Sequence, residues 1–438
     1  MTLHYEDGGL RLFHGSNRDI LPTFADASFD SIVTDPPYEL GFMGKGWDSS
    51  GIAYDVEVWR ECFRVLKPGG YLLSFGGTRT WHRIATAIED AGFEIRDSIA
   101  WLYGSGFPKS LDVSKQIDKN AGARRDPGAP VRDRVSPLRN ERYASGPAGF
   151  STEKGSKLAA EAGEPVTDDA KKWQGWGTAL KPAFEPIIVA RKPIAGTVAA
   201  NVLAYGTGAL NIDATRVATS DKLGGGAATG SGLATKSDGW SRPWMSDADA
   251  VDAHAERVRE NIAKAESLGR FPSNVLLEES QATALDAQTG TLTSGTGAVK
   301  RASSAARDGN RGAALGKESR AEGTEMVSYG DSGGASRYFP TFRYEAKAPG
   351  SERPTVDGVA HATVKPLELM RWLVRLVTRR GGHVLDLFAG SGTTAEAALL
   401  EGMDCTLIEL EADHLPLIMQ RIRKPLQTSL FGWEEASA

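Results

Sequence analysis

The stretch Gly381-Gly-His-Val-Leu-Asp-Leu-Phe-Ala-Gly-Ser-Gly-Thr-Thr394 decides the fold of this chain. Its apolar first half predicts a buried strand over 381–388, and the two glycines that follow predict a tight turn. A helix is expected at 395–401 and a second strand at 405–410, which carries Glu409. Strand, glycine turn, helix and an acidic strand end together form a nucleotide-binding layout, so an α/β fold with a Rossmann-like sheet is predicted.

The chemistry of this layout fits a nucleotide-like ligand. Glycines let a ligand approach the backbone, and the start of the helix supplies free amides and a positive dipole end. Glu409 can accept hydrogen bonds from both ribose hydroxyls. Gly390-Ser-Gly-Thr-Thr-Ala395 also fits the pattern G-x-G-x-x-A, so an NAD-dependent dehydrogenase is one alternative. However, Phe388 stands where the hydride-transfer fingerprint has its first glycine. A plain glycine turn of an α/β fold is a further, less favoured alternative.

A second stretch, Asp35-Pro36-Pro37-Tyr38, follows the apolar run Phe29–Thr34. The run predicts a buried strand, and each proline fixes its own φ and holds the preceding residue extended. The turn therefore presents a carboxylate, a backbone carbonyl of fixed direction and an aromatic face. This combination suits a flat base held through its exocyclic amino group, although Asp-Pro is also a common turn opener.

The remaining pattern supports an α/β layer with a parallel sheet. In the N-terminal part the sequence predicts strands at 10–14, 71–75, 93–103 and 184–192 and helices at 55–66, 80–91 and 197–205. Lys67-Pro-Gly-Gly70 should end the first of these helices, and Trp59 and Phe63 on it should pack in the core. Further along, it predicts a strand-like segment at 209–217, a charged helix near 247–268, a helix at 367–380 and a last helix ending near 423.

Composition excludes several classes of protein. The 438 residues are 40% hydrophobic and 24% charged, with a net charge of −5, so any nucleic-acid surface must be a local patch. The two cysteines, Cys62 and Cys405, lie far apart, which argues against a disulfide framework and a cysteine-rich metal site. There is no long apolar span or apolar signal core, so we expect a cytoplasmic protein.

Two segments are weakly patterned. Residues 104–172 form a poorly ordered insertion in this interpretation, and residues 290–335 are of low complexity. The piece 298–320 is basic and could bind phosphates, although a solvated linker is the slightly favoured interpretation. Its candidate DNA-binding residues are Lys300, Arg301, Arg307 and Arg311.

Together the motifs resemble the amino-group DNA methyltransferases that depend on S-adenosylmethionine. Asp35-Pro-Pro-Tyr38 matches the catalytic motif, Phe388-Ala-Gly-Ser-Gly-Thr393 the cofactor loop, and His361-Ala-Thr-Val-Lys-Pro366 a motif in which Ala362 replaces a proline. Phe63–Gly70 and Phe184–Val189 fit further family blocks. The catalytic motif precedes the cofactor loop, which is the order of the β subgroup. The region Gly104–Lys172 and its flanks also look like DNA methylases of bacteriophages and prophages. One departure is Gly15-Ser16, where the family usually has Gly-Asp.

The resemblance implies a Rossmann-like methyltransferase sheet with helices on both faces and an inserted target-recognition region. It implies catalytic roles for Asp35, Pro36, Pro37 and Tyr38. It also implies cofactor contacts from Lys365, Pro366, Asp386, Phe388, Ala389, Gly390, Ser391, Gly392, Thr393, Thr394 and Glu409. The expected domains are a catalytic half (1–194), a target-recognition region (195–345), a cofactor-binding half (346–425) and a tail (426–438).

The expected activity is methylation of the N6 amine of adenine in double-stranded DNA by base flipping, in a restriction-modification setting and at the nucleoid. An aspartate at the first motif position favours adenine over cytosine N4, which stays open as the runner-up. A catalytically inactive DNA-binding protein and an RNA substrate also stay open. A homodimer and a cognate restriction nuclease are possible partners.

Overall fold

The computed structural model describes residues 2–40, 49–104, 110–126, 163–221, 247–293, 299–300, 325–326, 332–342, 354–356, 358–361 and 363–423. The chain divides into two compact units, one made of Met1–Gly104 with Phe184–Ala438 and the other of Ser105–Ala183. Each unit is described by itself. Within the described ranges, no helix combines the length and apolar character needed to cross a membrane.

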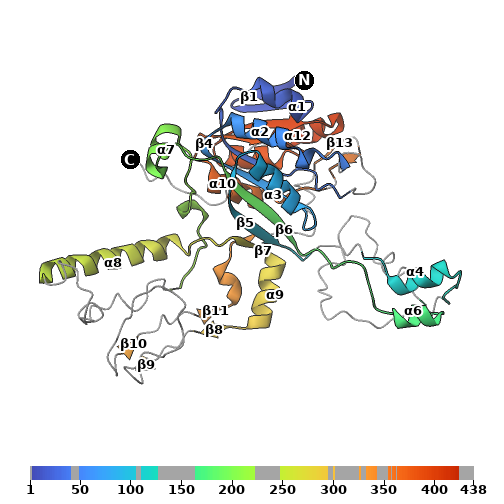
Figure 1. The fold of residues 1–438 in the computed structure, drawn as a ribbon. Coiled ribbons are helices and arrows are strands. Elements are labelled where there is room, and N and C mark those ends of the chain that lie inside the picture. The colour runs from blue at the N-terminus through green and yellow to red at the C-terminus, as the bar shows by residue number, and fades with distance from the viewer. Residues whose placement is uncertain are drawn as a thin grey trace. The chain divides into compact units, whose positions relative to one another are not determined.

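The larger unit is built on one sheet, whose described strands run in the order β1-β2-β16-β15-β3-β4-β6-β5-β7-β12 (Figure 1). In that order they are Thr2–Asp7, Leu10–His14, Asp404–Glu409, His383–Asp386, Phe29–Thr34, Leu66–Phe75, Phe184–Arg191, Glu94–Leu102, Val275–Glu278 and Thr341–Phe342. From β2 to β4 all neighbours are parallel. The parallel pairing that the sequence predicts holds over these strands, whereas β6 runs antiparallel to both β4 and β5 and β1 runs antiparallel to β2.

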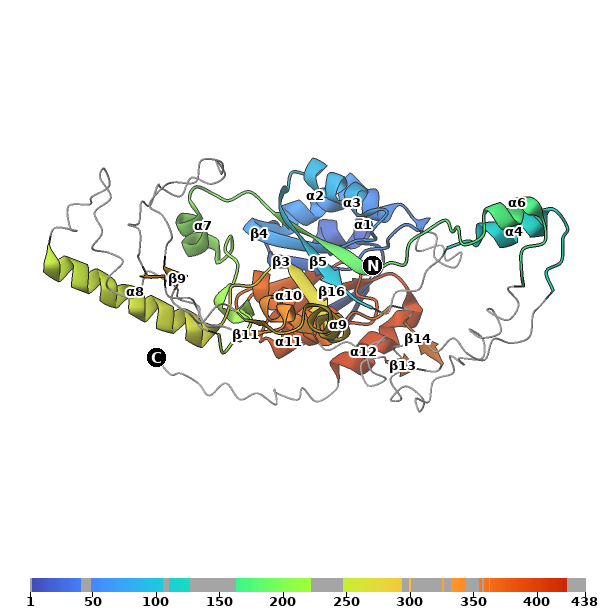
Figure 2. The same cartoon turned by 90° about the horizontal axis from the view of Figure 1, so that it is seen from below.

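Helices cover both faces of the sheet, as Figure 2 shows, with α2 (Val56–Val65) and α3 (Trp81–Asp90) opposite α10 (Leu367–Val377) and α11 (Thr393–Leu400). Strand alternation sends neighbouring side chains to different cores. Ile32 and Leu385 pack with the fully buried Trp59 of α2, whereas Val33 and Val384 pack with Leu373 of α10. Trp59 is thus a core residue as predicted, and Phe63 is partly buried beside the same core.

The other described elements of the larger unit are smaller. Its helices include α1 (Asn17–Ile20), α7 (Val198–Tyr205), α8 (Ala248–Leu268), α9 (Glu279–Thr289) and α12 (Leu415–Ile422). Its 3₁₀ turns are η1 (Leu21–Thr23), η4 (Ile52–Tyr54), η6 (Asp213–Thr215), η8 (Ala335–Tyr338) and η10 (Ala412–His414). Three short antiparallel ladders pair β8 (Leu292–Thr293) with β11 (Ser332–Gly333), β9 (Val299–Lys300) with β10 (Glu325–Met326), and β13 (Thr355–Val356) with β14 (Val359–Ala360).

Two local predictions need correction. The segment 209–217 is not a strand: Asn211 donates its backbone N–H to Leu376 at the end of α10, η6 follows, and only Val217 forms a single bridge, to Arg270. The strand expected from Tyr71 begins earlier, at Leu66, directly after α2. Gly69 adopts φ +77° there and donates its N–H to the carbonyl of Lys192, so the chain stays in the sheet instead of forming a separate loop.

In the smaller unit, α4 (Val113–Asn120) packs against α6 (Asp168–Lys172). The buried carboxylate of Asp118 joins them. It accepts hydrogen bonds from the backbone and hydroxyl of Thr167 and pairs with Arg125, whose Nε lies 2.7 Å from Oδ2. This unit therefore has a polar centre of its own.

Candidate active site

The Asp35-Pro-Pro-Tyr38 turn lies where the fully buried strand β3 ends. Because β3 is paired in parallel with β15, through Ser31–Val384 and Ile32–Leu385, the carboxyl ends of both strands open at the same edge of the sheet. β16 runs parallel to β15, so Glu409 at its end lies at this edge too. The pairing brings together the two motifs that are far apart in the sequence.

The two oxygens of Asp35 are in different situations. Oδ2 lies 2.5 Å from the Nζ of Lys365. Oδ1 is buried and has no hydrogen-bond partner among the residues that the structure describes. A buried acceptor without a partner is costly, so a donor that reached Oδ1 would gain the whole benefit of satisfying it.

Lys365 joins a small charged cluster beside the turn. Its Nζ lies 3.2 Å from the hydroxyl of Tyr38 and 3.5 Å from Oε2 of Glu185 at the start of β6. The Tyr38 hydroxyl donates to the same Glu185 oxygen at 3.0 Å. Burial alone would lower the pKa of Lys365, but the carboxylates of Asp35 and Glu185 raise that pKa above its usual value. The lysine is therefore a stable cation in this site.

Tyr38 is held in place through both its side chain and its backbone. Burial raises the pKa of Tyr38 well above its usual value, and the carboxylates of Asp35 and Glu185 raise it further. The phenol therefore stays protonated and keeps its hydrogen bond to Glu185. On the other side, the Thr80 hydroxyl donates to the Tyr38 carbonyl at 2.8 Å, which anchors the end of the turn.

The glycine loop between β15 and α11 needs both of its glycines. Gly390 and Gly392 have φ values of +52° and +77°, in the left-handed region that other residues avoid. A Cβ at Gly392 would lie 3.1 Å from Cγ2 of Ile418, and one at Gly390 would lie 3.0 Å from Nε2 of His361. The loop therefore has neither the conformation nor the space for side chains at these positions.

Asp386 connects the loop to the catalytic turn. Its Oδ1 accepts from the hydroxyl of Thr34, the last residue of β3, at 2.7 Å, and its Oδ2 accepts from the hydroxyl of Thr394 in α11 at 2.6 Å. The N–H of Phe388 donates to Oδ1 at 3.1 Å. Burial raises the pKa of Asp386 to about 6, even though these hydrogen bonds act in the opposite direction. One carboxyl thus ties β3, the loop and α11 together.

Glu409 anchors the far side of the loop. Its Oε2 accepts from the N–H of Gly390 at 2.7 Å and its Oε1 from the N–H of Glu411 at 2.9 Å. Nδ1 of His414 lies 3.3 Å from Oε1, and this contact raises the pKa of His414 above its usual value. The ring of His361 packs edge-on against that of His414, with 4.7 Å between centroids.

The structure brings most predicted site residues to one edge of the sheet, in two neighbouring groups. Lys365 belongs to the group of the catalytic turn, not to the glycine loop with which the family resemblance associates it. Ser391 and Thr393 share a hydroxyl contact of 3.0 Å, the Ala389 N–H binds the carbonyl of Ile408, and Pro366 caps α10. Of the predicted DNA-binding residues, Lys300 is described only as backbone in β9, and Arg301, Arg307 and Arg311 lie outside the described residues.

Sequence reasoning missed Glu185 and His414 as members of the site. Glu185 was visible only as one residue of the block Phe184-Glu-Pro-Ile-Ile-Val. The available signal was a lone carboxylate at the start of a strand that is otherwise buried. His414 carried no such signal, because its place depends on how η10 folds back toward Glu409.

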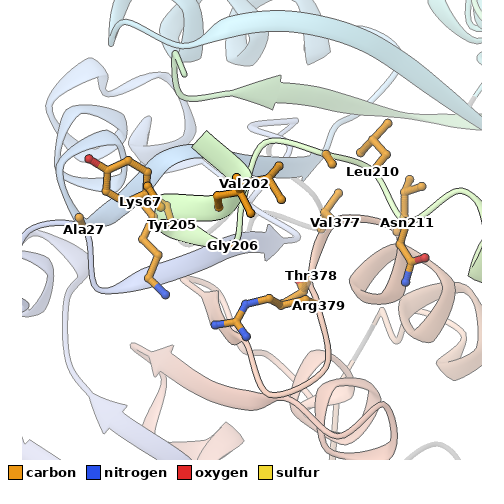
Figure 3. Close-up of a pocket in the computed structure, with 14 residues that line it drawn as sticks. Ala27, Lys67, Val202, Tyr205, Gly206, Leu210, Asn211, Val377, Thr378 and Arg379 are labelled. Atoms are coloured by element: carbon orange, nitrogen blue, oxygen red, sulfur yellow. The ribbon is translucent and has the colours of Figure 1, made fainter. Parts of the chain in front are cut away.

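A cavity of about 820 Å³ lies at the opposite edge of the sheet, where β3 and β4 begin (Figure 3). Ala27, Lys67, residues of α7 and Arg379 line it. The lysine in its lining forms an ion pair, since Nζ of Lys67 lies 2.8 Å from Oδ2 of Asp30. The cavity is thus separate from the residues of the catalytic turn and the glycine loop.

Comparison with known proteins assigns the family. Residues 29–420 match the family model described as DNA methylase, for N6 and N4 methyltransferases, and the chain belongs to this family. The type II methyltransferase M.HpaI of Haemophilus parainfluenzae is 34% identical over 104 residues, which are 22% of this chain and 33% of that protein. M.HindIII of Haemophilus influenzae is 29% identical over 160 residues, 36% of this chain and 38% of that protein. The matches thus span well under half of these relatives.

Among solved structures there are distant structural similarities. The cytosine-N4-specific PvuII DNA methyltransferase is 12% identical with a TM-score of 0.40, covering 96% of this chain and 88% of that one. M1.HpyAVI is 12% identical with a TM-score of 0.37, covering 94% and 98%. The expected kinship with bacteriophage methylases stays a prediction.

The raised pKa of Asp386 predicts a pH-dependent contribution to stability. A carboxyl with a pKa of about 6 in the folded chain and about 3.9 in the unfolded chain stabilises the fold below about pH 4, and this contribution is lost as the pH rises through about 6. We expect the free energy of unfolding of the wild type to fall by about 2 kcal/mol relative to Asp386→Asn between about pH 4 and pH 7. Urea unfolding at each pH measures it, and parallel curves for the two proteins would contradict the assignment.

Proposed function

We propose that the chain transfers a methyl group from S-adenosylmethionine to the N6 amine of adenine in double-stranded DNA. The observation that carries the proposal is the buried, unpartnered Oδ1 of Asp35 within the described residues. It belongs to a proline-fixed turn at the same sheet edge as a glycine loop with two positive φ angles. Membership of the DNA methylase family supports the same activity.

Two acceptors on the turn would prepare the amine for reaction. The lone pair of an adenine amine is delocalised into the ring, so it attacks poorly until it is localised on nitrogen. Asp35 Oδ1 and the Pro36 carbonyl can accept the two N–H hydrogens and stabilise the positive charge that develops on nitrogen. Tyr38 offers a ring on which the base can stack. When the cofactor is bound, an N–C bond would form as its S–C bond breaks, the electron pair of that bond would stay on sulfur as a neutral thioether, and the amine would release one proton to solvent.

The glycine loop fits the cofactor. Gly390 and Gly392 adopt positive φ angles without room for a Cβ, so the loop forms a tight turn, and the half-buried Gly390 offers its backbone to a nucleoside. Oε1 of Glu409 already contacts the Glu411 N–H and His414, whereas Oε2 accepts, among the described residues, only the Gly390 N–H and has a second lone pair with which it can accept a ribose hydroxyl. S-adenosylmethionine supplies an activated methyl group on sulfur, and the protein mainly positions the reactants.

The proposed substrate is a base within a DNA duplex. An amine paired within a duplex must leave the base stack before it can reach a buried carboxylate. The target-recognition region is proposed at 195–345, with its basic residues contacting phosphates. A homodimer and a partner nuclease remain parts of the proposal. The same two acceptors could hold the N4 amine of cytosine, which is the second candidate.

Replacing Asp35 tests the catalytic turn. Asp35→Ala removes one acceptor of the reacting amine, and we expect methyl transfer from tritium-labelled S-adenosylmethionine to DNA to fall by about a hundredfold or more. Cofactor binding, measured by calorimetry, should change little. Asp90→Ala, at an exposed position near the end of α3, is the control and should retain wild-type activity. Methylation at the wild-type rate in Asp35→Ala would reject the proposed site.

Replacing Gly392 tests the cofactor loop. Gly392→Val combines a strained φ of +77° with crowding against Ile418, and we expect the dissociation constant for S-adenosylmethionine to rise about tenfold or more. Gly381→Val is a matched control, because Gly381 has a φ of +73° but no described atom would lie within 4 Å of a Cβ at that position. Equal cofactor affinities in the two variants would mean that the loop does not hold the cofactor.

A further inference from the structure

Three charged side chains meet beside the reacting face of the catalytic turn. Asp35 and Glu185 each contribute −1 and Lys365 contributes +1, so the cluster carries −1 in total. Lys365 and Glu185 come from segments outside the turn, and their side chains are 11% and 20% exposed. Such a charge arrangement in a largely dry site acts strongly on nearby chemistry.

We infer that Lys365 and Glu185 are positioning residues for methyl transfer: Lys365 orients the Asp35 carboxylate, and Glu185 offsets the charge of Lys365. This inference rests on the proposed function. It concerns two residues that act through Asp35 and Tyr38 and need not touch the base themselves.

The role of Lys365 follows from the two oxygens of Asp35. Its Nζ lies 2.5 Å from Oδ2, while Oδ1 is the buried oxygen that has no partner in the described parts of the chain. A carboxylate held at one oxygen by a buried cation loses the freedom to rotate. Lys365 therefore keeps Oδ1 available in one direction, which is what an acceptor for a single N–H hydrogen requires.

The role of Glu185 follows from charge balance. A cation paired with Asp35 alone would bring the local charge to zero and weaken Asp35 as an acceptor for an amine that becomes positive. Oε2 of Glu185 lies 3.5 Å from the same Nζ, so the lysine charge is shared between two carboxylates. The remaining −1 matches the +1 that develops on the amine.

Glu185 also holds the aromatic member of the turn. Its Oε2 accepts the hydroxyl hydrogen of Tyr38 at 3.0 Å. The ammonium of Lys365 lies 4.7 Å from the ring centroid of Phe75, at the end of β4, next to which β6 runs. The cluster thus receives Glu185 from β6 and Lys365 from the segment before α10. Through these two residues it can hold the Asp35 and Tyr38 side chains in place at the same time.

A double-mutant cycle separates this role from an ordinary structural ion pair. Glu185→Gln keeps the shape and an acceptor for Tyr38 but changes the cluster charge to 0, whereas Lys365→Met changes it to −2. The double variant returns the charge to −1. We expect each single variant to slow single-turnover methyl transfer about tenfold or more, with less than about a threefold change in cofactor affinity.

The double variant gives the decisive result. Because it restores the charge, its loss of rate should be at least about fivefold smaller than the product of the two single losses. Lys365→Arg, which keeps the positive charge, should recover part of the rate that Lys365→Met loses. Multiplicative losses, or a wild-type rate in Glu185→Gln, would overturn the inference. Glu185→Gln also serves if the Lys365 variants do not fold, because it changes the side-chain volume very little.

Asp35→Ala, assayed in the same series, distinguishes a failure of the proposed function from a failure of this inference. If Asp35→Ala still methylates DNA, the proposed function itself is wrong. If Asp35→Ala is inactive while Glu185→Gln keeps the wild-type rate, only the inference about the charged cluster fails.

Discussion

The parallel pairing of β3 with β15 is the constraint on which the rest of the site depends. It joins Ser31 to Val384 and Ile32 to Leu385, and so brings the ends of two strands from opposite parts of the chain to one edge. Asp386 strengthens this junction, because its carboxyl binds the hydroxyls of Thr34 and Thr394, which belong to the two sides. The catalytic turn and the glycine loop would each be ordinary features on their own, and this pairing makes them neighbours.

Two aspartates at this junction differ in how their carboxylate oxygens are hydrogen-bonded. Both Asp386 oxygens accept hydroxyl hydrogens and the carboxyl is fully buried, which suits a structural connection. Asp35 has one oxygen fixed by Lys365 and one left without a partner in the described residues. The first arrangement stabilises the fold, and the second keeps an acceptor ready for a ligand. The difference supports the assignment of the chemistry to Asp35.

The sequence predicted the local parts of this arrangement well. Two prolines and two glycines constrain the backbone by themselves, so the residue types alone were enough to place the turn at 35–38 and the loop at 388–394 at strand ends. Glu185 could not be placed in this way, because its position depends on β6 entering the sheet antiparallel between β4 and β5. The strand expected at 209–217 failed because its alternating apolar residues have a helix end, not a strand, as backbone partner.

The most direct test of the central claim is to identify the modified base. DNA from a methylation-free host that expresses this chain can be read by single-molecule sequencing, with the Asp35→Ala variant in parallel. The account predicts N6-methyladenine at a defined sequence in the first DNA and none in the second. N4-methylcytosine would redirect the proposal to the other amine, and the same modification in both DNAs would contradict the role of the catalytic turn.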